Sequence, residues 1–158
     1  MTRSKWVRRA LASAAVFAAT GALADTGTLA VSATISPTCK LTSVPPMSFS
    51  LNPVTTANGT ANSVVTYRCT KGTAPAGFTV GGGASPYASG TSPLKGTGTN
   101  TDTLPFSITW TNPTTAGTGL GTDQTPQQVT LSGTILNADF VNAAADTYST
   151  NVAVVITP

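Results

Sequence analysis

A short segment near the N-terminus alternates between larger apolar side chains and smaller residues. The alternating positions are Leu29, Val31, Ala33 and Ile35, with Ala30, Ser32 and Thr34 between them. A period of two places the four side chains on one face of a β-strand. This face needs an apolar partner surface, so the segment predicts an amphipathic strand that the fold must cover.

Residues 1–24 have the organisation of a secretory signal peptide. A basic start is followed by an apolar run from Ala10 to Leu23, and Ala22-Leu23-Ala24 matches a small-x-small cleavage site. The run is shorter than the roughly 20 apolar residues of a membrane span and is interrupted by polar residues, which favours cleavage over an uncleaved anchor. We expect an exported mature chain beginning at Asp25, of a length suited to one domain.

Charge and titratable chemistry are scarce after residue 24. Four basic side chains stand against five aspartates, and the sequence contains no His and no Glu. Without a basic patch, nucleic acid and acidic membranes are poor partners. Without His there is no ready general base and no imidazole ligand, and the scattered aspartates lie beside turns, where they serve local hydrogen bonding. We therefore predict no catalytic residues, no metal site and no cofactor.

Strand candidates recur at short intervals with turn residues between them. The best central strand is 64–70, in which Val65, Tyr67 and Cys69 share one face. Polar loops are predicted at 81–103, with one short strand near Leu94, and at 112–126. Further alternating stretches lie at 39–41, 47–51, 78–80, 104–111, 129–135 and 148–157. About seven strands predict an all-β sandwich.

Two of these stretches carry specific expectations about burial. Within 104–111, Trp110 falls on the apolar stripe of Phe106 and Ile108, which favours a core position over a sugar-stacking one. The last stretch, 148–157, is apolar on both faces, which predicts a central or covered strand.

Both cysteines, Cys39 and Cys69, follow the predicted cleavage site. An even count in an oxidising compartment favours one disulfide, with two reduced thiols as the alternative. A disulfide would close a loop of about 30 residues and contribute roughly 3–4 kcal/mol in the chain-entropy model.

Four blocks of the chain resemble, in order, the spore coat protein U domain proteins, which are also known as pilins of the archaic chaperone–usher class. The blocks are Leu29–Cys39, Met47–Ser50, Val64–Thr70 and Thr147–Thr157. The sequence departs from the family pattern at Ser50 and Asp146, where Gly is usual, and at Asn151, near the usual Asp.

The resemblance implies an incomplete immunoglobulin-like β-sandwich that lacks its final strand and is completed by donor-strand exchange. It implies a donor strand in residues 25–36 and a pilin domain in residues 37–158. The family's partners are other copies of the chain, a periplasmic chaperone and an outer-membrane usher, on the way to a surface fibre. The site residues that it implies are Leu29, Val31, Ala33 and Ile35 as donors, Val152, Val154 and Ile156 facing the acceptor groove, the carboxylate of Pro158 as a chaperone anchor, and a Cys39–Cys69 disulfide.

Two other functions remain open from the sequence. The first is a secreted binding or adhesin module whose own first strand folds back to complete its sandwich. The second is a spore or surface coat protein assembled by the same strand exchange.

Overall fold

The computed structural model describes residues 25–90 and 92–158, so the predicted signal peptide lies outside the described residues. The chain divides into two units, one ending at Thr34 and one beginning at Ile35. In the first unit the described residues, 25–34, form no strand and are exposed. No helix in the described part of the chain is long and apolar enough to cross a membrane.

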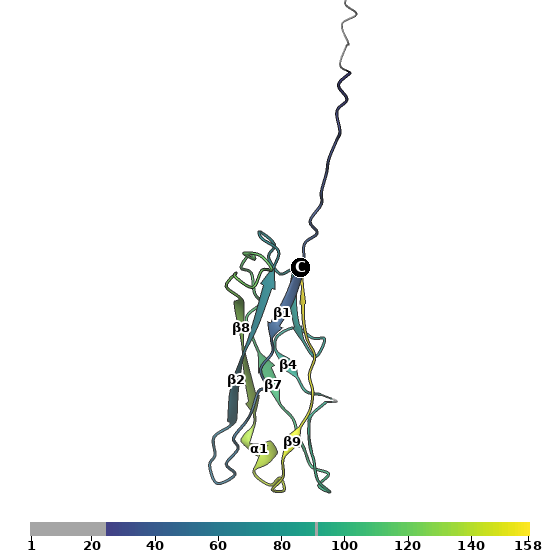
Figure 1. Ribbon diagram of the computed structural model, residues 1–158. Coiled ribbons are helices and arrows are strands. Elements are labelled where there is room, and N and C mark those ends of the chain that lie inside the picture. The colour runs from purple at the N-terminus through teal and green to yellow at the C-terminus, as the bar shows by residue number, and fades with distance from the viewer. Residues whose placement is uncertain (1–24, 91) are drawn as a thin grey trace, which may run out of the picture. The chain divides into compact units, whose positions relative to one another are not determined.

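The largest sheet of the second unit has five antiparallel strands in the order β1-β2-β8-β7-β4 (Figure 1). Its centre is the ladder between β2 and β8, which runs from Gly59 opposite Ile135 to Tyr67 opposite Gln127. The bounds are β1 Cys39–Ser43, β2 Gly59–Cys69, β4 Tyr87–Ala88, β7 Ser107–Thr109 and β8 Gln127–Ile135.

Two smaller sheets complete an all-β, sandwich-like arrangement. In one, β3 (Gly77–Val80) pairs with β10 (Val154–Thr157). In the other, β5 (Leu94–Gly96) lies between β6 (Thr103–Leu104) and β9 (Tyr148–Ser149). The one helix of the described residues, α1 (Asn137–Phe140), follows β8 directly.

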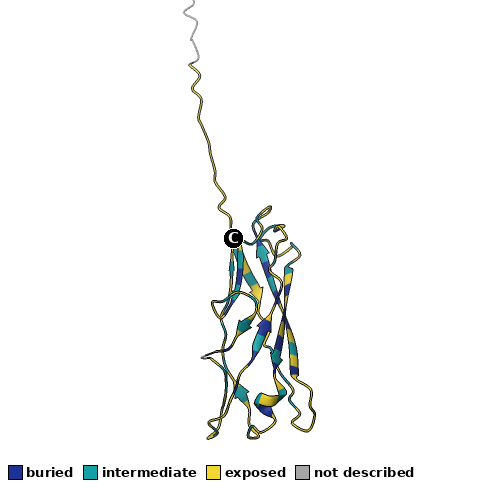
Figure 2. Cartoon of the chain, turned by 180° about the vertical axis from the view of Figure 1, so that it is seen from behind, coloured by how far each residue is buried: buried dark blue, intermediate teal, exposed yellow. Residues whose placement is uncertain are grey.

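The core lies between these sheets and follows the strand alternation (Figure 2). On β2, Val65, Tyr67 and Cys69 are fully buried, as the sequence predicts. The ring of Phe78 meets that of Trp110 edge-on, with the ring centroids 6.0 Å apart. Trp110 is thus a core residue, which confirms the prediction from its apolar stripe.

The predicted strand 104–111 is divided in the structure. Leu104, Phe106, Ile108 and Trp110 are all buried, but β6 ends at Leu104 and β7 begins only at Ser107. Pro105 lies in the gap, and a proline has no N–H to donate to a ladder.

Two further strand predictions are wrong, the first wholly and the second in part. Residues 47–51 form no strand, and 148–157 forms only β9 and β10, with no strand at 150–153 between them. β10 is also not covered: among the strands of the described residues it pairs with β3 alone, and Val155 on its outer face is 47% exposed. Alternation predicts which side chains are buried. A strand also needs a neighbouring strand to hydrogen-bond with, and among the described residues these segments lack such a neighbour on at least one edge.

Candidate functional site: an open apolar groove

A groove of about 400 Å³ opens into the core of the second unit. One wall is residues 44–49 and the other is residues 150–154. Core side chains form its floor: Val80 from β3, Phe106, Ile108 from β7 and Leu131 from β8. Ser63 and Leu94 also line it. The hydrophobic core is therefore accessible from outside along this line.

The first wall continues from the end of β1. Met47, Phe49 and Leu51 are half-buried, while Ser48 and Ser50 between them are exposed. The hydroxyl of Ser63 donates to the carbonyl oxygen of Pro45 at 2.8 Å, which holds the segment against β2. Among the described residues, no backbone hydrogen bond joins 44–51 to another segment. The wall is thus extended and packed by its side chains but unpaired.

Gly133 of β8 makes room for this wall. A Cβ atom at Gly133 would lie 2.6 Å from Cζ of Phe49 and would also collide with the sulfur of Met47. The two side chains can therefore cover β8 only because residue 133 has no side chain.

The second wall runs through 150–153, between β9 and β10, and ends at Val154, the first residue of β10. The one backbone hydrogen bond of 150–153 within the described residues runs from the N–H of Gly81 to the carbonyl oxygen of Ala153, at 2.7 Å. An extended backbone with unpaired groups beside an apolar surface is suited to pairing with a foreign strand. The groove offers two such edges, one on each side.

The structure brings together only some of the residues that the sequence marked. Val152 and Val154 line the groove; Ile156 packs against the core, opposite Phe78, outside the lining. Pro158 is exposed. Leu29, Val31 and Ile35 are 85, 84 and 82% exposed, and Ala33 is also exposed.

The predicted disulfide between Cys39 and Cys69 is present. The two residues are register partners in the β1–β2 ladder, with their Cα atoms 4.1 Å apart. Just before it, Thr38 accepts a hydrogen bond from the N–H of Thr70 at 2.8 Å and donates its own N–H to the Thr70 hydroxyl at 3.1 Å. The chain therefore enters the β-sandwich at a fixed point.

Several lining residues were missed by the sequence reasoning, namely Val44, Pro45, Ser63, Thr150 and Asn151. Val44 and Pro45 stand between two predicted strands and carry no periodic signal. The hydroxyl–carbonyl bond of Ser63 joins residues 18 apart, so a local pattern could not reveal it.

The lining of the groove is mostly apolar. It contains no acid, base or thiol, and no group of three potential ligands that could hold a metal occurs among the residues that the structure describes. Such a site can bind an extended apolar segment, with side chains entering the core and backbone groups meeting the two walls.

These features define a class: an immunoglobulin-like β-sandwich that is one strand short and whose core opens through the gap. Comparison of sequences places the chain within that class. It belongs to the Spore Coat Protein U domain family, whose model matches residues 25–155. The family is one of structural coat and pilin proteins, associated with pilus subunits of chaperone–usher systems. No curated protein and no solved structure matches the chain.

Proposed function

We propose that the chain is a structural subunit of an exported surface fibre, in which residues 25–36 of one copy fill the groove of the next. The observation that carries this proposal is the opening of the core between two walls with few backbone hydrogen bonds: in the described part of the chain none joins 44–51 to another segment, and 150–153 makes one, to Gly81. The same chain has an alternating apolar segment, 29–35, whose large side chains are exposed. The segment would supply what the groove lacks, namely apolar side chains to fill it and a backbone to pair with its walls.

The expected energetics support stable insertion. Burying one larger aliphatic side chain stabilises by about 1.5–3 kcal/mol. Leu29, Val31, Ala33 and Ile35 together would contribute roughly 5–8 kcal/mol, an upper figure because area-based values overstate the gain. Hydrogen bonds to the two walls would add to this.

Each copy would offer one donor segment and one groove, so the contacts are head-to-tail. A head-to-tail contact whose rotation does not close into a ring builds an open fibre, which is the assembly proposed here. Before assembly a periplasmic chaperone would cover the groove, with the exposed carboxylate of Pro158 as an anchor for one of its basic residues. An outer-membrane usher would then exchange the chaperone for the next subunit's donor segment at the cell surface.

The decisive test is a charge on the inserted face of the donor segment. We expect Val31→Asp to abolish fibres while export continues, because a carboxylate cannot enter an apolar groove uncompensated. Electron microscopy of cell surfaces and detergent-resistant ladders on gels measure the fibres, and the amount of exported protein measures export.

Ser32→Asp is the matched control, since Ser32 lies on the opposite face of the same segment. It should leave the fibres intact. Normal fibres from Val31→Asp, or equal loss from both variants, would contradict donor insertion. A stable monomer with residues 28–35 paired in its own sheet would favour the self-complemented alternative.

A further inference from the structure

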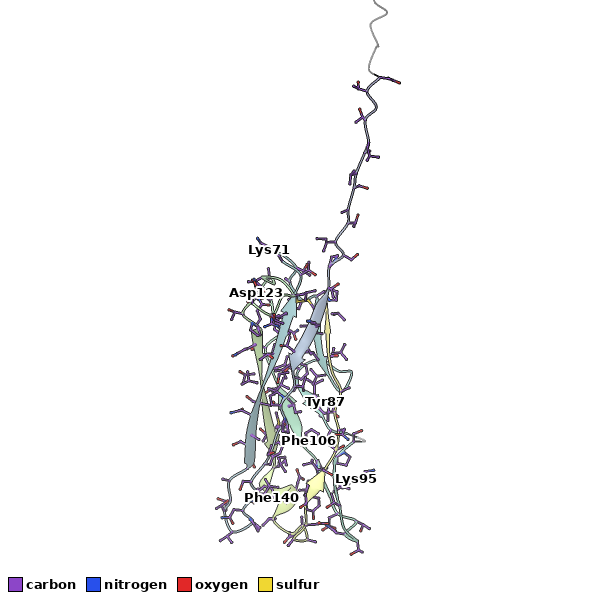
Figure 3. The ribbon with its side chains drawn as sticks, viewed as in Figure 1. Lys71, Tyr87, Lys95, Phe106, Asp123 and Phe140 are labelled. Carbon is purple, nitrogen blue, oxygen red and sulfur yellow. A yellow bond between two sulfur atoms is a disulfide. The ribbon has the colours of Figure 1, made fainter. Side chains whose placement is uncertain are left out.

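The second unit has an uneven charge distribution along its strands. The end where β1 begins and β2 ends carries Lys40, Arg68 and Lys71 against Asp123 and the terminal carboxylate of Pro158, and is here named the basic end. The end where β2 begins and β8 finishes carries Lys95, Asp102, Asp139 and Asp146, and is here named the acidic end. Figure 3 shows Lys71 and Asp123 at one end, and Phe140 of α1 with Lys95 toward the other.

Hydrogen bonds fix three of the charged groups to these ends. Arg68 donates to the carbonyl oxygens of Gln124 at 3.1 Å and Thr122 at 3.3 Å, which binds the 119–126 loop to the basic end. At the acidic end, Asp102 accepts from the N–H of Ala144 at 2.9 Å, and Asp146 accepts from the N–H of Gly98 at 3.2 Å. The charge separation is therefore part of the folded structure.

Exposed apolar side chains accompany the carboxylates at the acidic end. Val54 is 90% exposed and Leu136 is 53% exposed, with Val141 also exposed. The loop bearing Val54 is fixed to α1, because Asn137 donates from its side chain to the carbonyl oxygen of Thr55 at 2.8 Å and from its N–H to the Asn58 side chain at 2.9 Å. Asp139 lies between Leu136 and Val141 in the chain. Apolar groups beside charged ones are typical of a protein interface.

We propose that the basic end of one copy docks on the acidic end of the next, as a second contact beside the inserted strand. This inference rests on the proposed function. Only Pro37 and Thr38 separate the donor segment from Cys39, and two residues reach about 7 Å. A donor strand that fills a neighbour's groove therefore brings its own basic end against that neighbour.

The direction of insertion decides which end it meets. β10 runs toward the basic end, where the C-terminus lies (Figure 1). A donor strand antiparallel to β10 leaves the groove at the acidic end, so opposite charges meet. A parallel donor strand would leave at the basic end and bring like charges together, so the charges select the antiparallel orientation. At a separation of about 7 Å, salt near 0.15 M screens this interaction only in part.

The test exchanges charges at both ends with matched pairs of full-length variants. Lys71→Glu and Lys95→Glu change the net charge equally but at opposite ends. Asp139→Lys and Asp123→Lys form the reverse pair. None of the four residues lines the groove or belongs to the donor segment. The measurement is the distribution of angles between neighbouring copies in sheared fibres, obtained by image classification in electron microscopy.

We expect Lys71→Glu and Asp139→Lys each to reduce the ratio of docked to undocked neighbours by about 2–5-fold, the size of one exposed charge interaction. Lys95→Glu and Asp123→Lys should keep the ratio or raise it. Raising sodium chloride from about 0.02 M to about 0.5 M should make the unmodified fibre resemble Lys71→Glu. All of these fibres should remain linked by the inserted strand.

Equal effects of Lys71→Glu and Lys95→Glu, or a ratio insensitive to salt and to all four variants, would overturn the docking proposal while leaving strand insertion in place. Absence of polymers from the unmodified chain, or normal polymers from Val31→Asp, would instead overturn the proposed function.

Discussion

The ladder between β2 and β8 and the two walls of the groove have the same alternating sequence pattern but different hydrogen bonding. In the ladder, Val65 is paired with Val129 and both side chains are buried. In the walls, Phe49 and Val152 also point toward the core, but their segments form no ladder with each other or with a third strand among the described residues. One side of the sandwich is closed and the other is open.

This difference separates two properties that are often inferred together from an alternating pattern, namely side-chain burial and backbone pairing. A period of two indicates which side chains face an apolar surface. It does not indicate whether the backbone has a partner, because the partner depends on segments distant in the chain or in another molecule. In this protein both sides of the sandwich have the alternating pattern. Within the described residues, only the closed side has a neighbouring strand with which its backbone forms a ladder.

The largest expected effect is on amide hydrogen exchange. In the chain alone, amides of 44–51 and 150–153 should exchange roughly 100-fold or more faster than those at the centre of β2 and β8, because they lack ladder bonds. In the fibre, part of this difference should disappear as the donor segment pairs with the walls. Exchange followed by mass spectrometry measures both states.

Slow exchange of both walls in the chain alone would contradict an open side. Unchanged fast exchange of both walls in the fibre would show that the groove is not filled by a pairing strand.

A second prediction concerns Gly133 of β8, against which Met47 and Phe49 of the first wall pack. Gly133→Ala should lower the free energy of unfolding by about 1–3 kcal/mol, because its methyl group displaces Phe49 and Met47. Urea unfolding measures the loss. The displacement should also reshape the groove, so fibres of the variant should dissociate at a lower temperature.

Gly83→Ala is the matched control. A Cβ atom there would lie 3.8 Å from the nearest atom, the carbonyl oxygen of Val80, which is an ordinary contact. Its free energy of unfolding should change by less than about 0.5 kcal/mol. Equal stability of both variants would mean that the wall does not pack on β8 as described.

The smallest expected effect lies on the closed side, at Tyr67. Burial raises the pKa of the Tyr67 hydroxyl above its usual 10.0, because the phenolate is disfavoured in the core. The unfolded chain therefore loses this proton first, so the stabilisation is complete below pH 10 and declines as the pH rises through the folded-state pKa. Tyr67→Phe should make the decline shallower, by at most about 1.4 kcal/mol for each pH unit. Unfolding by urea at several alkaline pH values measures the slopes, and equal slopes would place Tyr67 in solvent.

The sequence predicts most of the closed side because its signals are local. The faces of β2 and of the 104–110 stripe follow from alternation, and the disulfide follows from an even cysteine count in a chain predicted to be exported. The interruption at Pro105 could also have been predicted, since proline is visible in the sequence. The helix α1 could not, because it has no side-chain cap and is fixed instead by the bonds from Asn137 to Thr55 and Asn58.

The candidate site is less predictable from the sequence because its lining comes from segments that are distant in the chain. Alternation in the last stretch identified Val152 and Val154 as inward-facing, and the resemblance to the family assigned that face to a groove. Val44, Pro45 and Thr150 became lining residues only when two distant segments came to lie on either side of the same opening. The role of residues 29–35 as a donor stays a prediction, since its partner surface would belong to another copy.

In the proposed fibre, the disulfide would have a mechanical consequence under tension. A pull on the donor segment would reach the β-sandwich at Thr38 and Cys39, where β1, an edge strand, begins. Hydrogen bonds alone would allow that strand to peel away. The covalent bond to Cys69 would pass the load directly to β2, the strand with the longest ladder in the sheet. The load would then be shared along the whole of β2 and β8 instead of breaking the hydrogen bonds of β1 one at a time.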